Sequence, residues 1–141
     1  MGTVYAEITL KNGGDAIDGK RGLIKEDAIH SLTVNAIVDT GAGTLVISEE
    51  QRLQLGLEVR REHVVRMANN VQETVKITDP VEIHWKNRES ICFPWVIPDS
   101  PKVLLGAIPL EDMDLIVDPK NEELVGRHGE EMEGYLYGIP A

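Results

Sequence analysis

One aspartate stands where a side chain could do chemistry. Asp39 follows the strand-like segment Val34 to Val38 and begins the stretch Asp39-Thr40-Gly41-Ala42-Gly43. A carboxylate at the end of a strand is held rigidly and can act as a general acid or base. Gly41 permits an unusual backbone angle or a close approach, and the small residues leave room for another group. Asp-Thr-Gly is also typical of a turn, so the tripeptide alone does not decide between the two interpretations.

The sequence lacks the residue patterns typical of metal sites, nucleotide-binding sites and serine or cysteine nucleophiles. The four histidines lie far apart in the sequence, and no HExxH, GxGxxG, P-loop or GxSxG motif is present. Cys92 lies in the apolar segment Ile91-Cys92-Phe93, which is typical of a buried, unreactive thiol. We therefore expect no metal and no cofactor.

Composition narrows the class of protein further. The 141 residues suit one domain, covering 1–141, with a core of about 3–125 and an acidic tail at 126–141. A single cysteine excludes an intrachain disulfide, which fits a reducing compartment. The net charge of −10 argues against nucleic acid and anionic membranes as partners. No apolar run approaches the roughly 20 residues of a membrane span, and the start lacks a signal peptide, so we expect a cytoplasmic protein.

The elements that must position Asp39 are mainly strands. Apolar residues alternate with polar ones from Val4 to Leu10 and from Leu32 to Val38. The Gly-rich stretch 11–22 between them is predicted to be a loop. Further strands are expected at His63–Met67, Val71–Ile77, Val81–Trp85, Ile91–Ile97, Val103–Leu105, Leu115–Val117 and Leu124–Val125.

Turns and short helices separate these strands. Ser48-Glu49-Glu50-Gln51 has the spacing of a capping box, so a short helix should follow it and end near Gly56. Asn69-Asn70 suits a two-residue hairpin turn, because Asn tolerates positive φ. We also expect a polar turn at Lys86–Glu89, a loop at Pro98–Pro101, one helical turn at Pro109–Met113 and a turn at Asp118–Asn121. The prediction is an all-β fold with one or two short helices.

Two short motifs give this pattern a family resemblance. The segment Ala36-Ile37-Val38-Asp39-Thr40-Gly41-Ala42 resembles the active-site signature of the retropepsin-like aspartic proteases. Val103-Leu104-Leu105-Gly106, about 65 residues later, resembles the apolar-apolar-Gly segment that the family carries beneath its active-site loop. The opening strand with Leu10-Lys11-Asn12-Gly13 and the segment Leu115 to Pro119 look like the small cellular members found in prokaryotes. The resemblance implies a closed β-barrel that acts as a two-fold homodimer.

The resemblance also implies roles for single residues. Aspartic proteases need two carboxylates that share one proton, as is established for the family. This chain has one Asp-Thr-Gly, so the second carboxylate would be Asp39 of a second copy. Thr40 would bond across the dimer axis, Gly41 would line the floor, and Ala42 would keep the loop tight. Gly106 would pack beneath the loop, while Ala68, Asn69 and Asn70 would form the tip of a flap over a peptide substrate.

Two features depart from the viral members of this family, one in the active-site loop and one in the flap turn. Many of these have an acidic residue where Gly43 stands, and that side chain helps to hold the peptide backbone. Their flap turn commonly has glycine where this chain has Asn69-Asn70. The first departure concerns the grip on the substrate, and the second concerns the stiffness of the flap.

Three functions fit these observations. The leading hypothesis is a homodimeric aspartic endopeptidase that hydrolyses peptide bonds. A non-catalytic dimeric module of the same fold, binding peptides or acting as a scaffold, is the alternative, because fold does not fix function. The third is a plain β-barrel interaction domain with Asp39 in a surface turn.

Overall fold

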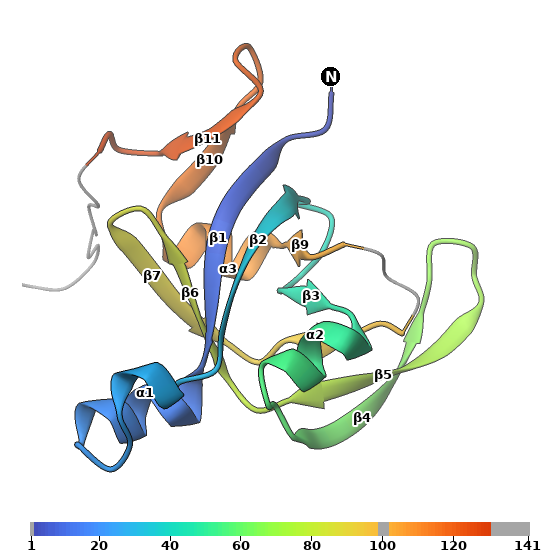
Figure 1. The fold of residues 1–141 in the computed structure, drawn as a ribbon. Helices are drawn as coiled ribbons and strands as arrows, with labels where there is room; N and C mark the ends of the chain where they lie inside the picture. The colour runs from blue at the N-terminus through green and yellow to red at the C-terminus, as the bar shows by residue number, and fades with distance from the viewer. Residues whose placement is uncertain (1, 99–101, 131–141) are drawn as a thin grey trace, which may run out of the picture.

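The structure is a computed structural model and describes residues 2–98 and 102–130. Strands dominate it (Figure 1). In chain order the elements are β1 (Tyr5–Asn12), α1 (Gly13–Lys20), the 3₁₀ helix η1 (Glu26–Ala28), β2 (Ser31–Val38), β3 (Val46–Ile47), α2 (Glu49–Gln54), β4 (Val59–Arg66), β5 (Gln72–Thr78), β6 (Val81–Trp85), β7 (Arg88–Cys92), β8 (Trp95–Val96), β9 (Leu104–Leu105), α3 (Ala107–Asp112), β10 (Leu115–Asp118) and β11 (Glu123–Gly126).

Most of the described strands belong to one curled sheet. Its order is β4-β5-β8-β3-β9-β2-β1-β6-β7, and β10 and β11 form a separate pair. Figure 1 shows the sheet curving around the core as a half-barrel. The predicted closed barrel is therefore not formed by the described residues, because β4 and β7 stand at opposite ends of the strand order and do not pair with each other.

The alternation in the first two strands is confirmed. In β1 the side chains of Ala6, Ile8 and Leu10 are buried, and their sequence neighbours are more exposed. β1 pairs with β2 in antiparallel register from Tyr5 opposite Ile37 to Lys11 opposite Ser31. The period of two places one apolar face on the core and fixes the register. The strand that leads to Asp39 is therefore paired with β1 from Ser31 to Ile37.

The predicted loop at 11–22 is wrong, because residues 13–20 form the helix α1. Two glycines at its start argue against a helix by propensity. Tertiary contacts override that preference. The Asn12 side chain caps the helix by accepting from Asp15 N at 3.1 Å, and Gly13 N donates to Pro80 O at 2.8 Å. A Cβ on Gly13 would lie 2.7 Å from Pro80 O, so glycine permits this close approach.

The capping-box prediction is confirmed. Ser48 Oγ accepts from Gln51 N at 3.2 Å, and Gln51 Oε1 accepts from Ser48 N at 2.8 Å. Both bonds satisfy amide groups that the first turn of a helix leaves unpaired. Gly56 follows α2 at a φ of +63°, which suits glycine at a helix end.

Several turns differ from their predicted form. The connection between β4 and β5 spans residues 67–71 and is longer than the predicted two-residue turn. It is closed by bonds from Asn70 N to Met67 O and from Met67 N to Val71 O, both at 2.9 Å. Only Asn70 of the two asparagines takes positive φ, at 67°. The turn after β6 is shorter than predicted, since β7 already begins at Arg88. The predicted strand Ile91–Ile97 is split into β7 and β8, with Phe93 and Pro94 between them.

The C-terminal elements agree in type with the predictions. The short strand at Leu104–Leu105 and the pair β10–β11 are present. α3 begins two residues before the predicted helical turn and brings the described residues to three short α-helices, against the one or two expected. Of the predicted loop at Pro98–Pro101, residues 99–101 lie outside the described residues, as does the tail from residue 131.

A buried arginine fastens the C-terminal hairpin to the sheet. Arg88 at the start of β7 is 3% exposed. Its guanidinium donates to the backbone oxygens of Met113 at 2.8 Å, Asp114 at 2.6 Å, Gly129 at 2.6 Å and Glu130 at 3.1 Å. Charge-assisted bonds of this kind offset the cost of burying the cation.

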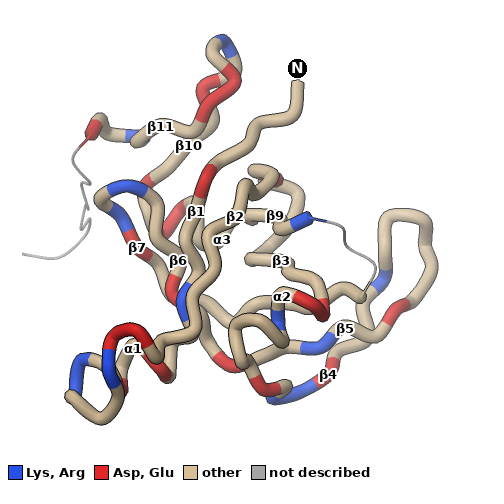
Figure 2. Tube along the Cα trace, in the orientation of Figure 1, with Lys and Arg blue, Asp and Glu red and all other residues tan. Residues whose placement is uncertain are grey.

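Charge is spread over the whole chain. Figure 2 shows Lys and Arg on α1, β4 and the β6–β7 turn, interleaved with Asp and Glu. Across the described residues, no helix is long and apolar enough to cross a membrane.

Candidate active site

Asp39 lies just beyond the end of β2, and its own loop holds it. Its N–H donates to Leu105 O at 3.0 Å, and its carbonyl accepts from Ala42 N at 3.1 Å. The carboxylate oxygen Oδ1 accepts from Gly41 N at 2.9 Å. Among the described residues, none donates a hydrogen bond to the other oxygen, Oδ2. The half-buried carboxylate is therefore oriented by one oxygen and available through the other.

Gly106 packs against the backbone of this loop. Parallel pairing of β2 with β9, with Val38 opposite Leu105, brings the two predicted motifs side by side. β9 lies between β2 and β3 in the sheet, so the loop from Asp39 to Leu45 crosses the end of β9. A Cβ on Gly106 would lie 2.2 Å from Thr44 O and 2.6 Å from Ala42 O. No side chain fits at this position.

The first turn of α3 completes the support of the loop. Ala107 N donates to Ala42 O at 2.9 Å, and Ile108 N donates to Gly43 O at 3.1 Å. The first N–H groups of a helix have no partner within the helix, so a neighbouring carbonyl satisfies them well. The loop thus has fixed backbone contacts on both sides of Ala42.

The outer side of the same loop is open. Thr40, Gly41 and Gly43 are exposed, and Ala42 is half-buried. A Cβ on Gly43 would meet nothing within 4 Å. The loop therefore presents small, exposed residues to whatever approaches it.

The candidate flap is the β4–β5 hairpin, which projects away from the rest of the sheet (Figure 1). Its tip residues Ala68, Asn69 and Asn70 are all exposed. Arg66 stiffens the tip by donating to Asn70 Oδ1 at 3.0 Å. In the sheet, β8, β3 and β9 lie between this hairpin and β2. No hydrogen bond between the tip and the Asp39 loop is found in the described part of the chain, so the structure does not bring these predicted site residues together.

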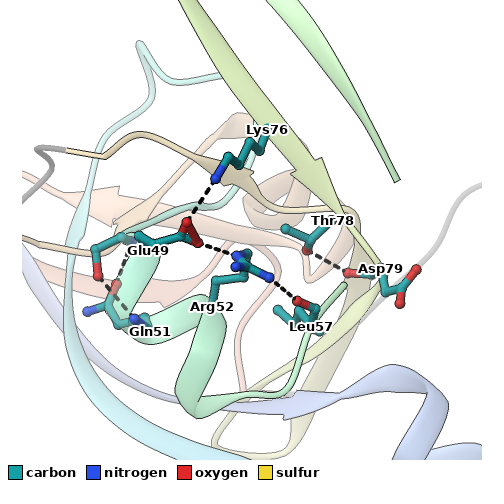
Figure 3. A network of polar contacts seen from close by, with 8 residues as sticks. Glu49, Gln51, Arg52, Leu57, Lys76, Thr78 and Asp79 are labelled. Carbon is teal, nitrogen blue, oxygen red and sulfur yellow. Dashed lines mark hydrogen bonds and ion pairs between the residues drawn. The ribbon is translucent and has the colours of Figure 1, made fainter. Parts of the chain in front are cut away.

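A polar network ties the base of this hairpin to α2 (Figure 3). Lys76 of β5 donates to Glu49 Oε2 at 2.9 Å. Arg52 also pairs with the Glu49 carboxylate, and its Nη1 donates to Leu57 O at 2.7 Å. This network is not evident from the sequence. Its capping box located α2, but no local signal pairs Glu49 with a lysine in a distant strand.

Glu49 and Cys92 have shifted pKa values. Hydrogen bonds from Arg52 and then from Lys76 hold the pKa of Glu49 below its usual range. Burial raises the pKa of the Cys92 thiol to about 11, so at neutral pH it carries little thiolate. The predicted burial of Cys92 is confirmed.

Comparison with known proteins identifies the class. A family model described as aspartyl protease matches residues 27–108, which include the Asp39 loop, the hairpin and Gly106. The described fold is similar to the retroviral protease-like domain of Ddi1 from Leishmania major, with a TM-score of 0.56 and 17% sequence identity. That likeness covers 89% of this chain and 88% of the other, and at this identity it shows the fold alone.

The chain belongs to the retropepsin-like aspartic protease family. The resemblance found in its two short motifs is thereby confirmed. No curated protein sequence matches it.

Proposed function

We propose that the protein is an aspartic endopeptidase whose active site is shared by two copies of the chain. The observation that carries this proposal is the Asp39 loop: one carboxylate held at a strand end, with an exposed surface of small residues beside it. A two-fold axis at this loop would bring Asp39 against its own copy, and each chain would contribute half of the site.

The chemistry follows from two adjacent carboxylates. One Asp39, ionised, takes a proton from water as the water oxygen attacks the peptide carbonyl carbon. The other, protonated, donates a hydrogen bond to the carbonyl oxygen and then gives its proton to the leaving nitrogen. Thr40 and Gly41 would contact the partner loop and the substrate. The exposed tip at Ala68 to Asn70 would close over an extended peptide, which excludes water from the site.

Replacing the carboxylate with an amide tests the proposal. Asp39→Asn should abolish cleavage of a diverse peptide library, read by mass spectrometry between about pH 4 and 7, while sedimentation still reports a dimer. Asp27→Asn, at an exposed aspartate in η1, is the matched control and should cleave normally. Cleavage that persists in Asp39→Asn would overturn the assignment.

The same experiment distinguishes the endopeptidase from the alternative, a non-catalytic peptide-binding module. A wild-type protein that is dimeric and binds peptides without cutting any of them is a binding module of the same fold. If the wild type is a monomer at micromolar concentration, the proposal of a site shared by two chains is wrong.

A further inference from the structure

A histidine lies between two carboxylates on the outer face of β6 and β7. The period of two along a strand places Glu82 and His84 on the same face of β6. The antiparallel register places Glu89 of β7 directly opposite His84. Coordinating atoms of the three side chains all lie within 4.8 Å of one another. Three groups separated in the sequence thus become one cluster through strand pairing.

Each ring nitrogen of His84 faces a different carboxylate. Nε2 lies 2.8 Å from Glu82 Oε1, and Nδ1 lies 3.7 Å from Glu89 Oε2. A neutral imidazole has one N–H and one lone pair. When Nε2–H donates to Glu82, the lone pair of Nδ1 points toward the negative oxygens of Glu89. This arrangement favours a cation between Nδ1 and Glu89.

The spacing suits a divalent metal ion. Nitrogen and oxygen ligands about 2.0–2.2 Å from a tetrahedral Zn²⁺ lie roughly 3.4 Å apart, close to the separation found here. The Glu89 side chain is 62% exposed and can adjust, whereas that of Glu82 is 11% exposed and is held in place. Metal-bound histidines almost always donate their other N–H to a carboxylate or carbonyl, which is the position of Glu82.

We propose that His84 Nδ1 and Glu89 bind a late first-row divalent cation such as Zn²⁺, with Glu82 orienting the imidazole. The mixed nitrogen and oxygen set favours such an ion over Mg²⁺ or Ca²⁺, which prefer oxygen ligands. The cluster borders a cavity of about 310 Å³ beside α1, so there is room for water to complete the coordination.

Positive side chains at the same cavity do not fill this position. Lys11 lies opposite Glu82 in the β1–β6 register, yet the ion pair found for Glu82 among the described residues is the one with His84. Lys20 reaches the cavity from α1, and Glu26 from η1 adds a further negative charge. The Glu89 carboxylate is therefore available to bind a metal ion together with Nδ1 of His84.

The site is separate from the Asp39 loop. His84 lies opposite Thr9 on β1, while Ile37, two residues before Asp39, lies opposite Tyr5. Six residues of strand separate the two positions along the sheet, a distance of roughly 20 Å. Metal binding here does not depend on the proposed protease function.

Calorimetric titration of the full chain with ZnCl₂ tests the proposal. The wild type should bind with saturation at one ion per chain. His84→Ala and Glu89→Gln should each remove this binding. Glu82→Gln should weaken it by about 10- to 100-fold, as expected when a carboxylate that orients a ligand is lost. Co²⁺ in place of Zn²⁺ should give visible absorption that needs His84.

His30→Ala is the matched control. His30 also pairs with a carboxylate, with Nδ1 2.7 Å from Asp15 Oδ2, but only one carboxylate is paired with it among the described residues. This variant should bind Zn²⁺ as the wild type does. The proposal is overturned if the wild type shows no saturable binding, or if Glu89→Gln, an exposed change that leaves the fold intact by circular dichroism, binds Zn²⁺ equally well.

Discussion

At the scale of single residues, Asp39 and Gly106 depend on each other. The aspartate is oriented by its own loop, and the loop rests on a residue without a side chain. Both positions could be picked from the sequence because Asp-Thr-Gly and Leu-Leu-Gly are short, local patterns. Their contact was predicted by resemblance only, since nothing local says that Val38 pairs with Leu105.

Gly106→Ala should destabilise the protein by about 3 kcal/mol, because its Cβ would overlap rigid backbone atoms of Ala42 and Thr44. Gly43→Ala is the matched control, since its Cβ meets open space. It should change the free energy of unfolding by less than about 1 kcal/mol. Urea denaturation measures both. An equal loss of unfolding free energy in the two variants would contradict the conclusion that Gly106 is packed too tightly for a side chain.

At the scale of elements, the candidate flap depends on α2. Lys76 and Arg52 converge on Glu49, so the base of the hairpin is tied to a helix that the sequence predicted correctly. The strands and the capping box followed from periodicity and spacing. The helix at 13–20 did not, because its glycines argue against it and its support comes from Asn12 and Pro80, which no local rule joins.

Glu49→Gln should lower stability at neutral pH by up to about 1 kcal/mol, the usual range for a partly exposed ion pair. The folded protein binds a proton at Glu49 less readily than the unfolded chain, because Arg52 and Lys76 lower the pKa of Glu49. The stabilisation is therefore complete above the ordinary glutamate pKa of about 4.3 and is lost as pH falls through the lower folded value.

Unfolding curves from about pH 7 to about pH 3 measure this effect, and the wild type and Glu49→Gln should converge at the acidic end. Glu50→Gln is the control, because Glu50 is exposed in the same helical turn. A difference between wild type and Glu49→Gln that persists unchanged at the lowest pH would exclude the ion pair as its cause.

At the scale of the whole molecule, the described sheet is a half-barrel with two edges, β4 and β7. Strand content and spacing predicted a mainly β protein correctly. They could not predict whether the sheet closes, since closure depends on pairing between strands far apart in the chain. The boundaries 1–141 with a core of 3–125 stay a prediction, as does the homodimer.

Mixing subunits tests whether the site is shared. When wild type and Asp39→Asn chains are refolded together in equal amounts, only about one quarter of random dimers carry two aspartates. Peptidase activity should fall to about one quarter of that of the same total amount of wild-type chain. Wild type refolded with Asp27→Asn should keep full activity. A fall to one half would mean that each subunit works alone.

The position of β9 has a consequence for biosynthesis. β9 comes late in the chain yet lies between β2 and β3, so the support under the Asp39 loop cannot form until residues 104–106 have left the ribosome. Contacts between such distant segments form late in folding, because a long loop must close first. We expect Asp-Thr-Gly in a nascent chain to be exposed before β9 and α3 hold its loop in place. Until residues 104–106 are available to pair, the Asp39 loop therefore lacks the backbone contacts that hold it.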